Sequence, residues 1–140
     1  RFDGKYIKWK VLCIEDKMLI MVSEQILCKR AFHHTTKFDK WENTDIGRWL
    51  NGCFYEEVFS KTEKSRIEQR YGRYVSLLSM DDIMENSIDP GCFDKYETGW
   101  WMMEGLSVTY DENGELSING DCFTKEIGIC PVICIKLKHK

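Results

Sequence analysis

Hydrophobic residues in this chain are concentrated in short runs, and the first two runs lie close together. The segments 6–14 and 18–23 are rich in β-branched, aromatic and other apolar residues, and the polar pair Glu15-Asp16 lies between them. Two such runs around a tight polar turn are typical of antiparallel strands. The sequence therefore predicts an N-terminal β-hairpin.

Helix signals begin near residue 43. Asn43, Thr44 and Asp45 are all residues that favour the N-cap position of a helix. The short helix that follows carries three apolar residues on one side: Ile46, Trp49 and Leu50. Asn51 and Gly52 are common just beyond the end of a helix, and we expect them to end this one.

Two more helical segments are expected directly afterwards. The segment 54–59 predicts a helical turn with Phe54, Tyr55 and Val58 facing inward. Ser60 and Glu63 have the spacing of a capping box, in which each side chain accepts a hydrogen bond from the other residue's backbone. The helix that starts there should run to about residue 69, with Ile67 as its main core residue.

The segment after this helix is expected to contain a strand, a helix and a loop in succession. A strand is expected over residues 74–79 and a short helix over 81–85, followed by a surface loop over 86–99. The apolar side of the short helix is expected to contain Met80, Ile83 and Met84.

The last third of the chain favours strands. Strand-like runs occur at 100–103 and 106–110, and a polar turn then returns the chain antiparallel over 115–118. The segment 127–137 predicts a final long strand, which Pro131 interrupts because proline has no backbone N–H to donate.

The order of elements is strands, then helices, then strands, which predicts an α+β fold in one compact domain over residues 1–140. The architecture expected is an N-terminal β-hairpin, two or three short helices in the middle and a C-terminal antiparallel sheet. A hydrophobic content of 43% with 13% aromatic residues is enough for a packed core and excludes intrinsic disorder.

Charge and hydropathy exclude two classes of partner. The net charge of −3 gives no electrostatic support for nucleic-acid binding. The longest apolar stretch, 11–22, is interrupted by three charged residues, so no membrane insertion is expected. Residue 1 is arginine, which leaves open that the chain was excised from a longer one, and the localisation stays undetermined from this end.

Cysteines are unusually frequent, and their odd number excludes complete pairing within the chain. No C-x-x-C spacing typical of zinc ribbons occurs, and several cysteines have apolar neighbours, so buried thiols are favoured over one or two disulfides or a metal site. Reduced thiols point mildly toward a cytoplasmic location. The seven residues are Cys13, Cys28, Cys53, Cys92, Cys122, Cys130 and Cys134.

The adjacent pair His33-His34 is the one histidine cluster in the sequence. Two histidines on a loop can bind a transition metal or supply a general base. No cysteine or carboxylate stands at a recognised ligand spacing nearby, so solvated loop histidines are expected here. The sequence accordingly predicts no metal site and no cofactor.

Four tryptophans are the most informative aromatic residues. Such rings line sugar- or peptide-binding surfaces, but more often they fill cores. Trp41 and Trp49 belong to the helical region, where Trp49 is expected in the core. Trp100 and Trp101 are consecutive on a strand and must point to opposite faces, one into the core and the other toward a second layer or the surface.

The segment 41–52 resembles the signature of the bacterial domain-of-unknown-function family numbered 6273. The similarity extends to the segments Phe54-Tyr55, Glu63-Lys64-x-Arg66-Ile67, Trp100-Trp101 and Gly128-x-x-Pro131. The residues that carry the central motif are Trp41, Asn43, Asp45, Trp49, Leu50, Asn51 and Gly52. The resemblance implies a C-type-lectin-like domain, in which the terminal strands meet.

Two positions depart from the family pattern. Met103 and Cys130 stand where family members usually carry arginines. The resemblance therefore implies a divergent member, and it supplies no catalytic residue.

The leading functional prediction is a non-enzymatic recognition module of a bacterial protein whose ligand is a protein or a glycan. Late loops over 89–99 and 104–123 would present its binding surface. The candidate contact residues are the aromatic side chains of Tyr96, Trp101, Tyr110 and Phe123 and the polar side chains of Asp94, Glu104 and Asn119. No calcium-binding E-P-N or W-N-D motif is present, which argues against calcium-dependent sugar binding.

The sequence is also consistent with two other functions. One is a thiol- or metal-dependent enzyme related to formylglycine-generating proteins, with its chemistry around Cys122, Cys130 and Cys134. The other is a structural module that forms a homo-oligomer through an apolar patch of Met102, Met103 and Phe93.

Overall fold

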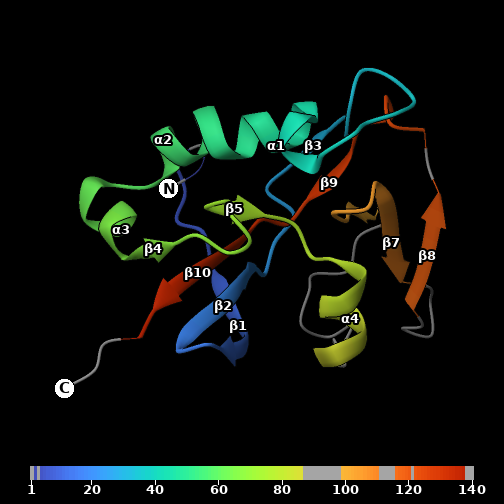
Figure 1. Cartoon of the computed structure of the whole chain (residues 1–140). Helices are drawn as coiled ribbons and strands as arrows, with labels where there is room; N and C mark the ends of the chain where they lie inside the picture. Colours follow the sequence, from blue (N-terminus) through green and yellow to red (C-terminus); the bar gives the residue numbers. More distant parts are fainter. Residues whose placement is uncertain (1, 3, 87–98, 111–115, 121, 138–140) are drawn as a thin grey trace.

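Two β-sheets and a band of short helices make up the fold (Figure 1). The computed structural model describes residues 2, 4–86, 99–110, 116–120 and 122–137. The α+β architecture predicted from the sequence is confirmed in outline, with an N-terminal hairpin, central short helices and a C-terminal sheet.

The N-terminal hairpin consists of β1 (Trp9–Glu15) and β2 (Met18–Ser23), paired antiparallel. Asp16 and Lys17 form its two-residue turn with φ angles of 49° and 63°. Positive φ at both turn residues matches the right-handed twist of the flanking strands. The predicted hairpin is confirmed, with its turn one residue later than expected.

The first sheet joins the two ends of the described chain. β2 pairs antiparallel with β10 (Val132–Lys136), and β10 also pairs with the short strands β4 (Ile67–Glu68) and β5 (Val75–Ser76). Its order is β1-β2-β10-β4, with β5 also on β10.

The second sheet has the order β3-β9-β6-β7-β8. β7 pairs antiparallel with its neighbours β6 and β8, and β3 does so with β9, but β6 and β9 pair in parallel. The predicted antiparallel C-terminal sheet is therefore wrong at this one pairing, because the chain crosses the β7-β8 hairpin before β9 returns beside β6. The strands are β3 (Cys28–Arg30), β6 (Trp100–Trp101), β7 (Leu106–Tyr110), β8 (Leu116–Gly120) and β9 (Ile127–Ile129).

Pro131 separates the two sheets. The long final strand expected from the sequence is instead two strands, because β9 belongs to the second sheet and β10 to the first. Proline lacks the N–H that a continuous ladder needs, and only its carbonyl is used, accepting from the Ser23 N–H at 3.0 Å.

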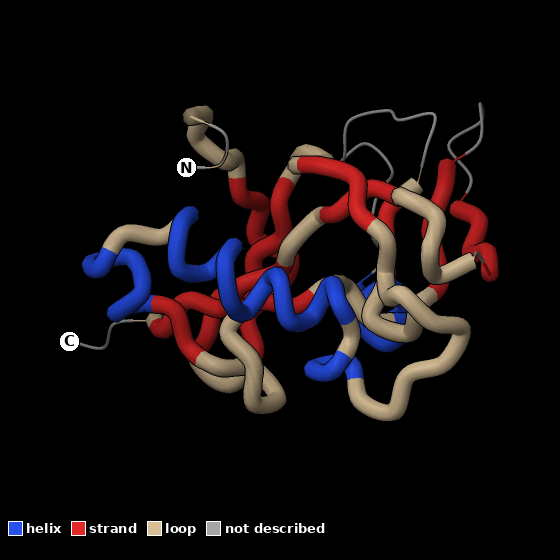
Figure 2. Tube along the Cα trace, turned by 90° about the horizontal axis from the view of Figure 1, so that it is seen from above, coloured by secondary structure: helices blue, strands red, loops and turns tan. Residues whose placement is uncertain are grey.

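The helical band runs through η1 (Trp41–Asn43), α1 (Asp45–Trp49), η2 (Leu50–Phe54) and α2 (Tyr55–Val58). Figure 2 shows these segments following one another almost in line. The helix end predicted at Asn51-Gly52 is wrong, because η2 continues the helix as a π-helical turn. The side chain of Asn51 bonds a neighbouring strand instead of stopping the helix.

The third helix, α3 (Lys61–Arg66), begins with the predicted capping box. The Ser60 hydroxyl accepts from the Glu63 N–H at 3.1 Å, and the Glu63 carboxylate accepts from the Ser60 N–H at 2.8 Å. The helix ends before residue 69, contrary to the prediction, because Ile67 pairs with β10 as part of β4. Its core position is confirmed, since it is 4% exposed.

The last helix is α4 (Met80–Asn86), close to the predicted range. Ile83 is buried as expected. Met84 is 75% exposed, so its predicted place on the apolar side is wrong.

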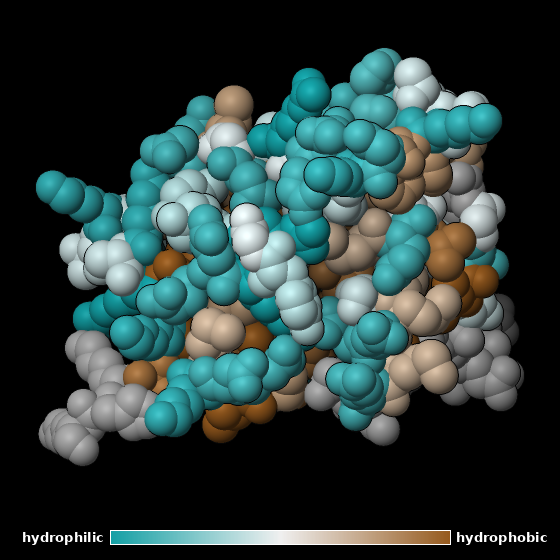
Figure 3. All heavy atoms as spheres, in the orientation of Figure 1, coloured by the Kyte–Doolittle hydropathy of each residue, from teal (hydrophilic) through white to brown (hydrophobic). Residues whose placement is uncertain are grey.

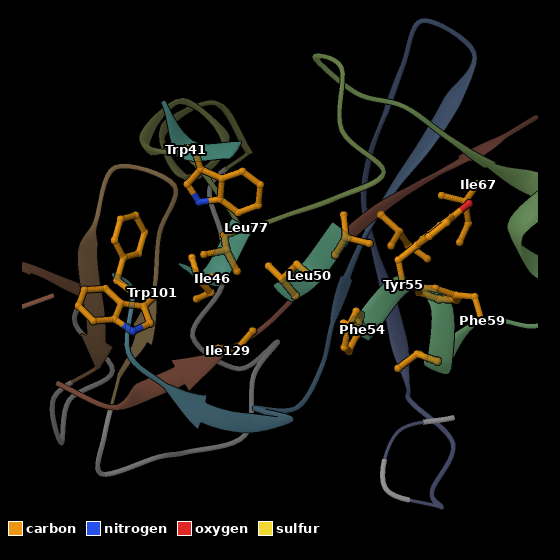
Figure 4. Packing of buried hydrophobic residues seen from close by; sticks show 14 of the residues in the cluster. Trp41, Ile46, Leu50, Phe54, Tyr55, Phe59, Ile67, Leu77, Trp101 and Ile129 are labelled. Atoms are coloured by element: carbon orange, nitrogen blue, oxygen red, sulfur yellow. The ribbon is translucent and has the colours of Figure 1, made fainter. Parts of the chain in front are cut away.

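The core consists of two clusters, and β6 contributes to both. Trp101 belongs to one cluster and Trp100 to the other, which confirms that they face opposite sides of the strand. Figure 4 shows Ile46, Leu50 and Phe54 spaced along the helical band within the first cluster, with Trp41 and Trp101 toward one end.

Polar side chains cover most of the face seen in Figure 3, and hydrophobic atoms are visible in the recesses between them. Among the helices of the described residues, none has both the length and the apolar character that a bilayer crossing requires.

Candidate functional site

A cleft of about 360 Å³ opens beside the start of α4. Three segments form it: the turn after β4, the stretch from β5 into α4, and the turn after β6. Its lining is mainly polar and consists of Arg70, Tyr71, Arg73, Ser76, Leu77, Ser79, Asp81, Asp82, Glu85, Met103 and Glu104.

A buried ion-pair network supports the floor of the cleft. The Arg70 guanidinium donates to both carboxylate oxygens of Asp82, at 2.8 and 3.2 Å, and to Glu15 at 3.0 Å. Burial alone would lower the pKa of Arg70, but the hydrogen bonds and charge of Asp82, with the charge of Glu15, raise it. Arg70 therefore stays charged although it is only 9% exposed.

Asp82 has a second role at the beginning of α4. Its carboxylate accepts from the Ser79 N–H at 3.0 Å, and its own N–H donates to the Ser79 hydroxyl at 3.1 Å. This reciprocal arrangement satisfies backbone donors that the first turn of a helix leaves open. The helix start and the ion pair are thus fixed by the same carboxylate.

The turn after β6 forms another wall of the cleft and is hydrogen-bonded to the beginning of α4. The Met103 N–H donates to the Leu78 carbonyl at 3.0 Å. The Glu104 carboxylate accepts from the Met80 N–H at 3.1 and 3.2 Å through its two oxygens. One backbone–backbone bond and one carboxylate–backbone bond therefore hold the turn after β6 against the beginning of α4.

Arg73 closes the end of the cleft nearest the helical band. It forms an ion pair with Glu42 and lies 5.3 Å from the ring centre of Trp41. Burial lowers the pKa of the Arg73 guanidinium. A second hollow, of about 270 Å³, lies against the other side of Arg73 and is bordered by Asn51 and Tyr74.

The candidate contact residues from the late loops do not gather in one place. Glu104 lines the cleft, whereas Asn119 is exposed on β8 and donates to the Thr109 hydroxyl at 3.2 Å. Phe123 is half-buried, with its ring centre 5.1 Å from that of Phe32.

Trp101 is fully buried, and its indole N–H donates to the Arg30 carbonyl at 2.8 Å. Its side chain is therefore closed to a ligand in this conformation. The backbone of Tyr110 pairs with Leu116 between β7 and β8. The candidates Asp94 and Tyr96 lie outside the described residues.

The motif around the helical band has structural roles. Thr44, rather than its neighbours Asn43 or Asp45, is the N-cap of α1 and accepts from the Gly47 N–H at 3.0 Å. Trp41 is in the core, whereas the core position predicted for Trp49 is wrong, because Trp49 is only half-buried, beneath the guanidinium of Arg30 at 4.1 Å.

The two adjacent histidines lie beside a carboxylate that the sequence spacing did not reveal. His34 donates from Nδ1 to the Asp45 carboxylate at 3.0 Å, and the Nδ1 of His33 accepts from the Asp45 N–H at 3.1 Å. His33 is 8% exposed, so the expectation of a solvated loop residue is wrong for it. These three side chains are the group among the described residues that could hold a metal.

The described cysteines are thiols with no disulfide among them, as the sequence favoured, but the predicted burial holds only for Cys130 and Cys134. Burial raises the pKa of Cys134 to about 11, with Arg70 counteracting part of this effect. Burial likewise raises the pKa of Cys13. Raised pKa values suppress the thiolate that nucleophilic chemistry needs. Cys53 and Cys122 are exposed, and Cys130 is buried.

Comparison with protein-family models finds no match, and searches of curated proteins and of solved structures return none either. The family resemblance noted in the sequence thus stays a prediction that rests on the motif residues. In the cleft, ion pairs and hydrogen bonds hold the charged side chains in fixed positions.

Proposed function

We propose that this chain is a non-enzymatic recognition module of a bacterial protein, and that its cleft beside α4 binds a basic segment of a partner protein. The observation that carries this proposal is the charge of the cleft rim. The lining contains four carboxylates and two arginines, which is a formal charge of −2.

Both arginines already have anionic partners inside the protein. Arg70 pairs with Asp82, and Arg73 pairs with Glu42. Asp81 and Glu85 are exposed, and within the described part of the chain neither forms an ion pair. Since residues four apart share one face of a helix, these two carboxylates present their charge together.

A lysine or arginine side chain would complement this rim. Charge-assisted hydrogen bonds to a carboxylate are about twice as strong as neutral ones, and the field of a cleft steers the encounter. Tyr71, which is 74% exposed, and the partly buried Met103 add apolar contact area beside the carboxylates. A glycan with amino groups is the second ligand class that this rim would suit.

We also infer a distant C-type-lectin-like arrangement. The pairing of β2 with β10 brings strands from the two ends together, and the helices and the β6-β7-β8 sheet follow in the expected order. These features support the inference but are shared with other α+β folds.

Two competing functions receive less support. An oligomer patch around Met102 is disfavoured, because Met102 is fully buried. Thiol chemistry at Cys134 is disfavoured by its raised pKa.

The test is selection from a display library of random linear peptides, with a glycan array probed in parallel. We expect enrichment of peptides with lysine or arginine, and an affinity at least about tenfold weaker for the double variant D81N/E85Q. Glu57→Gln is the matched control, since it removes an exposed carboxylate from α2 and should leave binding unchanged. Binding of glycans alone, or peptide affinity equal in D81N/E85Q and the wild type, would overturn the proposal.

A further inference from the structure

His33, His34 and Asp45 form a compact group of metal-ligating side chains. One nitrogen of each histidine and one oxygen of the Asp45 carboxylate all lie within 4.8 Å of one another. We propose that these three residues bind one divalent transition-metal ion such as Zn²⁺. The site shares no residue with the cleft, so it goes beyond the proposed function, and its test is independent of the test of that function.

Two of the three ligands are held in place by the fold. The Ile46 N–H donates to the Phe32 carbonyl at 3.2 Å, and the His33 N–H donates to the Phe123 carbonyl at 3.2 Å. The first bond joins the segment that carries His33 to the beginning of α1, where Asp45 follows the N-cap Thr44, and the second joins this segment to the turn after β8. A preformed pair of ligands reduces the ordering that metal binding would otherwise require.

Hydrogen bonds occupy the Nδ1 atoms of both histidines in the metal-free structure. The Nδ1 of His33 accepts from the Asp45 N–H, and a metal ion bound at this nitrogen would take its lone pair and replace that hydrogen bond. The Nδ1 of His34 faces a carboxylate and donates to it. An ion bound at this nitrogen would replace that proton, which leaves to solvent or moves to the other ring nitrogen.

The charge of the group suits a divalent cation. Two neutral imidazoles and one carboxylate carry a charge of about −1, and the described chain places no lysine or arginine in an ion pair with Asp45. Imidazole and carboxylate ligands together favour zinc, nickel or cobalt over calcium and magnesium, which prefer all-oxygen sites.

The distances are close to those of a tetrahedral site. Metal–ligand bonds of about 2.1 Å place tetrahedral ligands roughly 3.4 Å apart. The Nδ1 atoms of His33 and His34 lie 3.4 and 3.0 Å from Asp45 Oδ1. The side chain of His34 is 68% exposed, so its ring is free to make the small movement that brings all three ligand atoms to tetrahedral spacing. Water would fill the open position, as in zinc sites with three protein ligands.

The test is titration of the tag-free, EDTA-treated protein with Zn²⁺ and Co²⁺. We expect one ion per chain, with Co²⁺ absorption bands that lack a thiolate charge-transfer component. His34→Ala and Asp45→Asn should each raise the Kd for Zn²⁺ at least about tenfold, a loss typical even of residues that only support a ligand. His139→Ala is the matched control, because it removes the one remaining histidine of the chain.

Three results would overturn the proposal: no binding to the wild type, binding that His34→Ala and Asp45→Asn leave intact, or a Co²⁺ spectrum dominated by thiolate. His34→Ala removes an exposed side chain, so its thermal unfolding in EDTA should match that of the wild type. Thermal unfolding of the wild type should shift upward with Zn²⁺, and the shift should be absent in His34→Ala. A shift of equal size in both proteins would also contradict the site.

Discussion

The side-chain amide of Asn51 bonds both backbone groups of Val75, although the two residues are 24 positions apart. Oδ1 accepts from the Val75 N–H at 2.9 Å, and Nδ2 donates to the Val75 carbonyl at 2.8 Å. The amide thus attaches β5 to the helical band in the way that a paired strand would. It also donates to the Gly47 carbonyl at 3.1 Å, within its own helix.

Removal of this amide should destabilise the fold. Asn51→Ala leaves the Val75 groups and the Tyr74 N–H without their partner, and we expect a loss of about 2–3 kcal/mol in the free energy of unfolding. Urea unfolding followed by circular dichroism measures this. Asn43→Ala is the matched control, because within the described residues that exposed amide bonds Asp39 alone, and its loss should cost less than about 1 kcal/mol. Equal losses in the two variants would contradict the role of Asn51.

Two glycines in the same helical band should respond in opposite directions to alanine. A Cβ at Gly47 would lie 2.3 Å from the Trp41 carbonyl oxygen, so Gly47→Ala should cost about 1–3 kcal/mol. A Cβ at Gly52 meets nothing within 4 Å, so Gly52→Ala should stabilise the protein by roughly 0.5–1 kcal/mol. Thermal and urea unfolding of both variants decide this, and a destabilised Gly52→Ala would refute the continuous helix through η2.

Loss of the Asp82 carboxylate should destabilise the fold far more than loss of the Glu15 carboxylate, although both pair with Arg70. Asp82→Leu leaves a buried guanidinium with only Glu15, which is 36% exposed at the side chain, and we expect a loss of about 3–5 kcal/mol. Glu15→Gln removes the half-exposed carboxylate and should cost less than about 1 kcal/mol. Urea midpoints measure both. A small effect of Asp82→Leu would show that the ion pair contributes little to the fold.

The thiol of Cys134 should make stability depend on pH in the alkaline range. Its folded pKa of about 11 lies above the ordinary value of 9.0 because of burial, so the folded state retains a proton that the unfolded chain loses. The contribution is therefore fully present below pH 9 and is lost as the pH rises toward 11. Urea unfolding at several pH values should show a flatter profile for Cys134→Ala than for the wild type. Exposed Cys53→Ser serves as the control and should keep the wild-type slope.

Local signals in the sequence were enough to predict the hairpin, the capping box of Ser60 and Glu63, the opposite faces of Trp100 and Trp101, and the short helix near residue 81. Each depends on neighbours within a few positions, where chain geometry alone fixes which groups can meet. The candidate metal group was missed for the opposite reason. Asp45 follows His33 by 12 positions, and no ligand spacing connects them until α1 packs against the preceding segment.

The features that form the cleft were likewise set by contacts between distant residues. Arg70 and Glu15 are 55 positions apart, and their pairing needs β1 and the turn after β4 to meet across the first sheet. Backbone pairing with β10 likewise made Ile67 a strand residue rather than a helix residue, and sheet assembly placed β9 and β10 in different sheets. Local propensity is weak compared with the burial and backbone pairing that these contacts supply, so the assembled fold decided them.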